Sequence, residues 1–241
     1  MGQVYLIGAG PGAADLITLR GARILEQADV VLHDALVDDS LLALCRQARC
    51  VPVGKRAGGH SLPQSEINAR LIEAARSNRC VVRLKGGDPM LFGRAREEID
   101  ALRAAGIEVE VVPGVSAAFG ASAELMQSLT ERGVSRSVLF LTPRVGQGET
   151  QNPWARAAAA ADTLVIYMAG QQAGAIAEAL IDAGVPARRA AVIVENATRP
   201  NQRILPARLH TLFQVADALQ GGPAMLYIGE VYEPLVAQHE K

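Results

Sequence analysis

Short apolar runs alternate along this chain with longer stretches in which apolar residues recur every three or four positions. Short runs bounded by glycine, proline or polar residues are typical of buried strands, and the longer amphipathic stretches are typical of helices. The expected strands are Val4–Ile7, Val30–Asp34, one from Val51, one from Val81, Glu108–Val112, Ser137–Thr142, Thr163–Met168, Ala190–Glu195 and Ala224–Gly229. The expected helices are Leu16–Gln27, Ile67–Arg76, Ala95–Ala105, Trp154–Ala161, Ala173–Ala183 and Leu209–Leu219. This alternation predicts an α/β protein.

A break in the pattern at Pro113–Ala121 divides the chain into halves of ordinary domain size. We therefore expect an N-terminal α/β domain over residues 1–115 and a C-terminal α/β domain over residues 116–241.

The charge balance narrows the classes of partner. With 24 basic and 25 acidic residues the net charge is −1, so no general field attracts nucleic acid or an anionic membrane, and any basic site is local. The three cysteines and four histidines lack metal-ligand spacing, so we expect no metal. No secretory leader pattern follows Met1, and no apolar run approaches the ~20 residues of a membrane span, so we expect a cytoplasmic protein.

A glycine-rich acidic turn, Gly86-Gly87-Asp88-Pro89, follows the apolar strand from Val81. Ligands of open α/β sheets bind beyond the carboxyl ends of strands, glycines allow close approach, and Asp88 offers an acceptor. Arg94 and Glu97 then lie on one face at the start of the next helix. An ordinary turn beside a solvent-exposed ion pair explains the same residues.

A second glycine-rich turn, Gly8–Ala13, lies between the first strand and the first helix and fits the pattern G-x-G-x-x-A. Asp34 ends the next strand, as a ribose-binding acid does in dinucleotide sites. Pro11 removes a backbone donor from this turn, which favours a ligand without phosphates. A nicotinamide or flavin oxidoreductase remains an alternative on these residues.

Two loops have a composition suited to covering a substrate. Lys55, Arg56 and His60 stand among glycines and are suited to folding over an anionic substrate, although a solvated surface loop explains them equally well. The stretch Arg144–Pro153 contains two glycines and has no apolar anchor until Trp154, so we expect a mobile loop there. The sequence contains no G-x-S-x-G, P-loop or H-E-x-x-H motif.

Taken together, five motifs resemble one known family over nearly the whole chain. They are Gly8-Ala9-Gly10-Pro11-Gly12, Val53-Gly54-Lys55-Arg56-Ala57-Gly58, Gly86-Gly87-Asp88-Pro89, Val112-Pro113-Gly114-Val115-Ser116-Ala117 and Glu195-Asn196-Ala197-Thr198-Arg199-Pro200. In this order they resemble the tetrapyrrole methylases. The resemblance implies two α/β domains with a cofactor cleft between them, S-adenosylmethionine as methyl donor, no metal, a homodimer and a tetrapyrrole substrate such as uroporphyrinogen III.

The resemblance also implies roles for individual residues. The cofactor-binding residues would be Pro11, Gly86, Gly87, Asp88, Leu91, Ser116, Ala117, Met168, Ala197 and Ala224. The substrate carries many carboxylates, which arginine and lysine bind well, and the candidates for this role are Lys55, Arg56, Arg132 and Arg199. An electron-rich pyrrole carbon attacks the sulfonium methyl directly, and a base, Glu97 or Asp34, then removes a proton, with Arg94 beside it.

Some positions depart from the family pattern and affect the expected substrate more than the cofactor. They are Ala13, His33, Glu131, Pro143 and Arg144. At 241 residues we expect the chain to carry the methylating part alone, without the dehydrogenase and chelatase module of fused sirohaem synthases.

Overall fold

The computed structural model describes residues 2–54, 62–143 and 153–240. The chain forms two compact units, Met1–Ala117 and Ala118–Lys241, called unit 1 and unit 2 below; the predicted boundary lay between residues 115 and 116. The predicted class, two α/β domains, is confirmed. Lys55, Arg56 and Arg144, with most of the loop expected at 144–153, lie outside the described residues.

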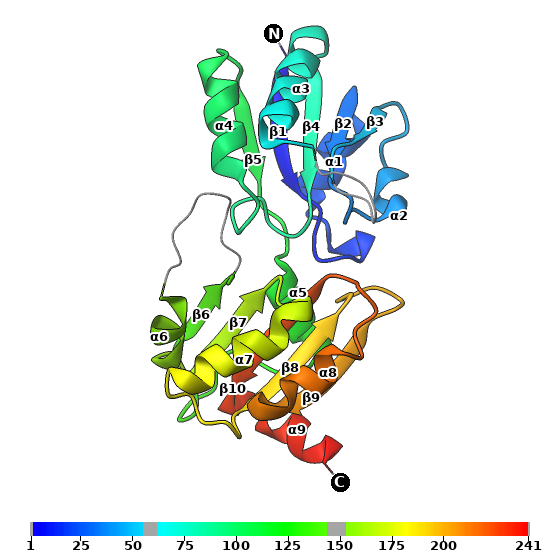
Figure 1. The fold of residues 1–241 in the computed structure, drawn as a ribbon. Helices are drawn as coiled ribbons and strands as arrows, with labels where there is room; N and C mark the ends of the chain where they lie inside the picture. The colour runs from blue at the N-terminus through cyan, green and yellow to red at the C-terminus, as the bar shows by residue number, and fades with distance from the viewer. Residues whose placement is uncertain (1, 55–61, 144–152, 241) are drawn as a thin grey trace. The chain divides into compact units, whose positions relative to one another are not determined.

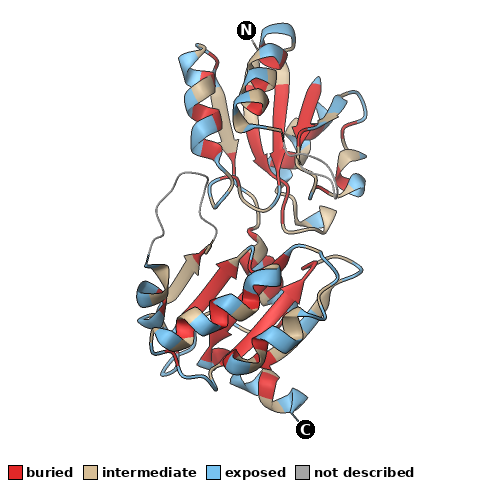
Figure 2. Ribbon diagram, in the orientation of Figure 1, coloured by how far each residue is buried: buried red, intermediate tan, exposed pale blue. Residues whose placement is uncertain are grey.

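Unit 1 is built on a five-stranded parallel sheet (Figure 1). Its spatial order is β3 (Arg49–Pro52), β2 (Val30–His33), β4 (Cys80–Lys85), β1 (Gln3–Gly8) and β5 (Val109–Val112). One face packs on α3 (Gln64–Ser77) and α4 (Ala95–Ala104), and the other packs on α1 (Leu19–Glu26) and α2 (Asp39–Leu42). The central strands are buried on both faces, as Figure 2 shows, which explains the apolar sequence of β2 up to His33; β4 is equally buried but contains Arg83 and Lys85.

Unit 2 contains a mixed five-stranded sheet. Its order is β6 (Val138–Leu141), β7 (Thr163–Tyr167), β10 (Ala224–Gly229), β8 (Ala190–Glu195) and β9 (Arg203–Arg208), with β10 antiparallel to both of its neighbours. The helices α6 (Trp154–Ala159), α7 (Ala173–Asp182) and α8 (Leu212–Ala216) cover one face. From the other face, Tyr227 donates its hydroxyl to the backbone oxygen of Ala118 in α5 (Ala117–Glu124). The last helix is α9 (Glu233–His239).

Some elements differ from the sequence expectations. Helix α1 begins at Leu19 rather than Leu16, because the Thr18 hydroxyl accepts the Gly21 N–H and caps the helix there. Strand β9 and helix α5 were not expected. Strand β9 lies at the sheet edge, where Pro206 is tolerated, and this proline interrupts its apolar run. In the described residues no helix combines the length and apolar character needed to cross a membrane.

In each unit the topology brings strand ends and loops to one edge of the sheet. In unit 1, Gly8 pairs with Lys85 and Ile7 with Val112, so the carboxyl ends of β1, β4 and β5 are neighbours. In unit 2 the antiparallel β10 places its first residue, Ala224, opposite Glu195 at the end of β8. The predicted cofactor residues therefore gather at one edge of each sheet, whereas Arg132 lies in a turn before β6.

Candidate active site

Three loops at the carboxyl edge of the unit 1 sheet pack backbone against backbone. The turn after β1 pairs with the turn after β4, since Gly87 donates its N–H to the Gly10 oxygen at 2.7 Å. A Cβ added at Gly114, in the loop after β5, would lie 2.3 Å from the Gly87 oxygen and 2.7 Å from the Gly8 Cα. Any side chain there would force the loops apart, so glycine is required where β1, β4 and β5 end.

Asp88 connects two of these loops. Its Oδ1 accepts the Met90 N–H at 2.8 Å, and its Oδ2 accepts the Gly114 N–H at 2.9 Å. The carboxylate therefore fixes its own turn and holds the loop after β5 against it. The role of Asp88 as an acceptor for a ligand stays a prediction, and the observed contacts show that the carboxylate holds the backbone around the predicted site.

The glycine turn after β1 lacks the geometry of a dinucleotide site. The N–H of Ala9 donates to the Lys85 oxygen at 2.7 Å, and the N–H of Gly10 donates to the Gly87 oxygen at 3.3 Å. The turn leads into a single 3-10 turn, Ala14–Leu16, and not directly into an α-helix, because α1 begins only after the Thr18 cap. A pyrophosphate is held by free N–H groups at a helix N-terminus, and this turn presents neither feature at these positions.

A cluster of charged side chains lies beneath this edge, on the face of β4 that packs against α4. Arg83, Lys85 and Glu98 are 2%, 3% and 0% exposed. Glu98 accepts from Arg83 Nε at 3.0 Å and from Lys85 Nζ at 3.0 Å, and the other end of Arg83 is ion-paired with Asp34. We call Asp34, Arg83, Lys85 and Glu98 the buried charge cluster. Sequence reasoning proposed Asp34 but missed the other members.

The pKa values of two cations in this cluster are shifted. Burial lowers the pKa of Lys85 and the nearby Arg83 lowers it further, while Glu98 and Asp34 act against this shift. Burial alone would lower the pKa of Arg83, but its ion pairs with Asp34 and Glu98 raise it overall. The cluster therefore depends on its carboxylates to keep both cations charged.

Arg94 and Glu97 pair with each other at the start of α4. The Arg94 guanidinium donates to both Glu97 oxygens, at 2.7 and 2.6 Å, and both side chains are exposed. This hydrogen bonding and the charge of Arg94 lower the pKa of Glu97. Arg94 and the nearby Phe92 both have positive φ angles, which L residues adopt only where surrounding structure holds them.

In unit 2 the backbone is strained where the sequence places cofactor residues. Met168, after β7, and Asn196 and Thr198, after β8, have φ angles of 57°, 54° and 63°. Such conformations are costly for side chains other than glycine and concentrate at functional sites. Ala197 lies within this strained turn and Ala224 is at the first position of β10, so three predicted cofactor residues gather at the same sheet edge.

Glu195 fixes the loop that faces this strained turn. The side chain is fully buried, and its Oε1 accepts the N–H groups of Gln220 at 2.8 Å and Gly222 at 2.9 Å. Arg203 lies 3.4 Å from the other oxygen. The sequence named Glu195 only as the start of a motif, and its contact with a loop 25 residues away depends on the antiparallel pairing of β8 with β10.

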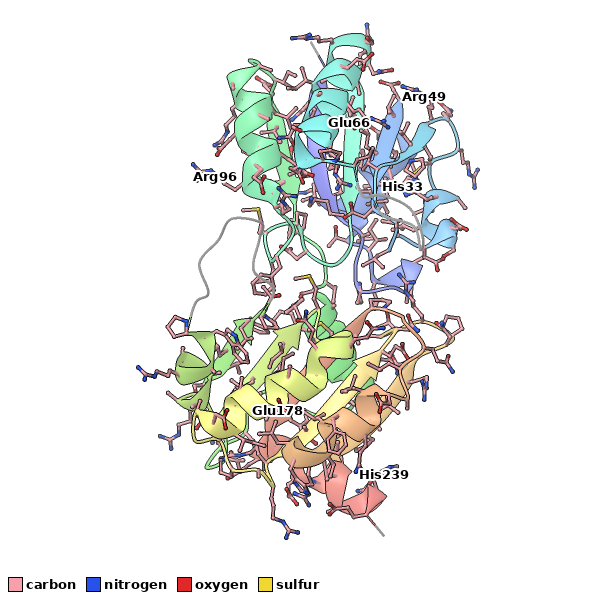
Figure 3. All side chains as sticks on the ribbon, in the orientation of Figure 1. His33, Arg49, Glu66, Arg96, Glu178 and His239 are labelled. Carbon is pink, nitrogen blue, oxygen red and sulfur yellow. The ribbon has the colours of Figure 1, made fainter. Side chains whose placement is uncertain are left out.

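The remaining predicted residues occupy different surroundings. Leu91 and Pro11 are half-buried in the turns after β4 and β1, and Ser116 and Ala117 lie where the loop after β5 enters α5. Arg199 is half-buried in the turn after β8, whereas Arg132 is exposed in a tight turn beside Glu131. Among the departures, His33 is buried at the end of β2, labelled in Figure 3, and Ala13 and Pro143 are half-buried. Over the described ranges, no three His, Cys, Asp or Glu side chains gather as metal ligands.

Comparison with known proteins defines the class of this fold and site. The sequence profile of a family described as Tetrapyrrole (Corrin/Porphyrin) Methylases matches residues 3–212. The chain belongs to the tetrapyrrole methylase family, as its motifs indicated.

Individual relatives narrow the comparison. A siroheme synthase of Zymomonas mobilis is 48% identical over 231 residues, which make up 95% of this chain and 49% of that protein. A siroheme synthase of Pseudomonas fluorescens is 44% identical, over 96% of this chain and 50% of that protein. The chain thus spans about half the length of the curated relatives it matches.

Solved structures match over nearly their whole length. A uroporphyrin-III C-methyltransferase of Thermus thermophilus, complexed with S-adenosylhomocysteine, has a TM-score of 0.85 and 38% identity, covering 97% of this chain and 100% of that one. A cobalt precorrin-4 methyltransferase of cobalamin biosynthesis has a TM-score of 0.83 and 28% identity, covering 95% of each chain.

Proposed function

We propose that this protein is a uroporphyrinogen-III C-methyltransferase that uses S-adenosylmethionine and supplies a dimethylated tetrapyrrole, precorrin-2, for sirohaem or cobalamin synthesis. The observation that carries the proposal is the match of nearly the whole chain to a uroporphyrin-III C-methyltransferase at 38% identity and a TM-score of 0.85. A methyltransferase acting on another tetrapyrrole is the second candidate, because a cobalt precorrin-4 methyltransferase has the same fold at 28% identity.

The residues proposed for the cofactor fit a ligand without phosphates. In unit 1 they are Pro11, Gly86, Gly87, Asp88, Leu91, Ser116 and Ala117, and in unit 2 they are Met168, Ala197 and Ala224. None of these residues carries a cation, most are small or apolar, and the N–H groups of Ala9 and Gly10 are already bonded within the fold. S-adenosylmethionine supplies a methyl group on a sulfonium, and alignment of this group with the attacking carbon would do most of the catalytic work.

The chain's own charged residues would bind and deprotonate the tetrapyrrole. Lys55, Arg56, Arg132 and Arg199 are proposed to bind its carboxylates, together with Arg94. Asp34 is the better placed of the two candidate bases. Both carboxylates are ion-paired, Glu97 through both oxygens with the exposed Arg94 and Asp34 through Oδ1 with Arg83, whose buried guanidinium is held in place by Glu98. Asp34 would accept the proton that the macrocycle loses after methyl transfer.

We further propose a homodimer, in which unit 2 presents an apolar groove to a second copy. Phe119 is 55% exposed and Met126 92% exposed, and with Val138 and Phe140 they line a cavity of about 610 Å³. Among the described residues that line this groove none is charged, so the same surface on a second copy would meet them without charge repulsion. Sedimentation should give a dimer that Met126→Glu converts to monomer, and a monomeric wild-type protein would refute this assignment. The proposed location is the cytoplasm.

The decisive experiment is anaerobic incubation with uroporphyrinogen III and S-adenosylmethionine, followed by mass analysis. Two added methyl groups are the expected result, and none would favour another tetrapyrrole. Calorimetry with S-adenosylhomocysteine and NADP separates the cofactor question from the substrate question. Micromolar binding of NADP without binding of S-adenosylhomocysteine would overturn the proposal.

A further inference from the structure

The buried charge cluster places ionic side chains in the core, where apolar side chains are usual. Arg83 and Lys85 alternate on β4 and therefore face the same side, where Glu98 of α4 lies between them. Desolvating such charges is costly, and an apolar group of similar volume generally stabilises a fold at least as well as a buried ion pair. Stability of unit 1 alone therefore does not explain why three ionic side chains occupy this position.

Glu98 contacts both cations of the cluster, Arg83 and Lys85, but not Asp34. Its Oε1 accepts from Arg83 Nε and Lys85 Nζ, its Oε2 accepts a second bond from Lys85, and Gln64 Nε2 lies 3.3 Å from Oε1. Arg83 Nη1 donates to the Leu84 oxygen at 3.2 Å, so the guanidinium is fixed at several atoms. With Nε bound to Glu98, Nη2 is directed at Asp34.

The chain of contacts runs from the interior to the surface. Glu98 is fully buried and the Arg83 side chain is 3% exposed, whereas the Asp34 side chain is 29% exposed. Asp34 follows β2 at the same sheet edge as the glycine loops, and it is the one cluster member that reaches solvent appreciably. A partly exposed carboxylate supported from below by a fixed guanidinium has its orientation determined by residues that no substrate touches.

We infer that Glu98 is a positioning residue for the methylation reaction, acting through Arg83 on the proton-accepting Asp34. Lys85 neutralises Glu98 and Gln64 helps to orient it. This inference rests on the proposed function, and within it assigns roles to three buried residues. The other titratable groups nearby in the described residues are His33, whose Nδ1 lies 3.2 Å from the backbone oxygen of Asp34, and Glu97, whose pKa is lowered in part by Lys85.

The test compares Glu98→Gln, which keeps the shape and removes the charge, with Asp100→Asn as control. Asp100 lies on the same helix in an exposed pair with Arg96, which Figure 3 shows extending away from α4. In the anaerobic methylation assay, kcat of Glu98→Gln should fall about 10- to 100-fold, the scale of misplaced catalytic groups. The KM for S-adenosylmethionine and the Kd for S-adenosylhomocysteine should stay within about twofold, and Glu98→Asp should recover part of the rate.

A pH profile separates positioning from a merely structural role. Glu98→Gln leaves excess positive charge beside Asp34, which favours the ionised carboxylate, so the acid limb of the kcat profile should move to lower pH. Asp100→Asn should leave the profile unchanged. An unaltered kcat and pH profile in Glu98→Gln would overturn the inference, and so would a parallel loss of kcat, cofactor affinity and melting temperature with an unshifted profile.

A second variant covers the case in which Glu98→Gln does not fold. The double variant Lys85→Met, Glu98→Gln removes one cation and one anion and keeps the ion pair between Arg83 and Asp34. It should fold, bind S-adenosylhomocysteine and show the same reduced kcat, and a wild-type kcat would refute the inference.

Wild-type turnover is measured first. Failure of the wild-type enzyme to methylate uroporphyrinogen III refutes the proposed function, whereas a normal wild type with normal variants refutes only the role of Glu98.

Discussion

Asp88 offers the sharpest test of how the unit 1 loops are built, because its carboxylate accepts one N–H within its own turn and one from another loop. The bonds to Met90 and Gly114 measure 2.8 and 2.9 Å. A hydrogen bond to a charged acceptor contributes about 1.5–3 kcal/mol, and the partial exposure of Asp88 favours the low end of that range. Asp88→Ala removes both bonds and should lower the free energy of unfolding by about 2–4 kcal/mol.

Asp88→Asn should cost about half as much, since the amide oxygen can still accept one of the two bonds. Urea denaturation followed by circular dichroism measures the loss, and amide hydrogen exchange at Gly114 reports the broken bond directly. Asp100→Asn, on an exposed side chain, is the control. Because the glycine loops surround the proposed cofactor residues, we also expect Asp88→Ala to weaken binding of S-adenosylhomocysteine by about 1–3 kcal/mol.

Two outcomes would refute this reasoning. If Asp88→Ala leaves both the unfolding free energy and the Gly114 exchange rate unchanged, the carboxylate does not hold the loops. If stability is unchanged but cofactor affinity is lost, Asp88 acts by direct contact with the cofactor, as the sequence alone suggested.

Three further predictions follow from the described geometry. Gly114→Ala should destabilise unit 1 by about 3 kcal/mol or more, because its Cβ would lie 2.3 Å from the Gly87 oxygen. Gly86→Ala is the matched variant, since its Cβ would meet nothing closer than 3.7 Å. It should keep wild-type stability in urea and weaken S-adenosylhomocysteine binding. Glu195→Gln should destabilise unit 2 by about 2–4 kcal/mol, measured by Trp154 fluorescence in urea, because a fully buried acceptor of two loop N–H groups loses its charge; an unchanged midpoint would contradict this. Burial, and then Cys50, raise the pKa of the Cys45 thiol from 9.0 to about 12, so this thiol's contribution to stability is complete below pH 9.0 and is lost as the pH rises towards about 12. Cys45→Ala should flatten the fall in melting temperature over that window, and an identical slope in the variant would count against the assignment.

Much of the fold could be predicted because its signals are local. Strands β2 and β8 are buried on both faces and are apolar up to their last residue, so they are visible as continuous hydrophobic sequence. Strand β9 could not be predicted in the same way. Its short apolar run is interrupted by Pro206, and only antiparallel pairing with β8 makes it a strand.

The candidate site, too, could be predicted from the sequence only in part. The motifs identified the family and the two glycine turns, but a turn sequence does not state what its groups contact. Asp88 was expected to contact a ligand, and the folded chain directs its carboxylate to the Gly114 N–H. Arg94 and Glu97 were expected on one helical face because their spacing is local, and they are paired there.

The sequence by itself determined the α/β class, the family and the positions of the glycine loops, because these depend on hydrophobic periodicity and on short motifs read within a few residues. Only the tertiary structure decided which side chains form the buried charge cluster. Arg83 and Lys85 sit in a strand whose sequence does not show their burial, and their partner Glu98 is 15 and 13 residues away on another element. A buried charge is tolerated only where an opposite charge meets it in space, and that meeting is set by the packing of α4 on β4 rather than by any local pattern.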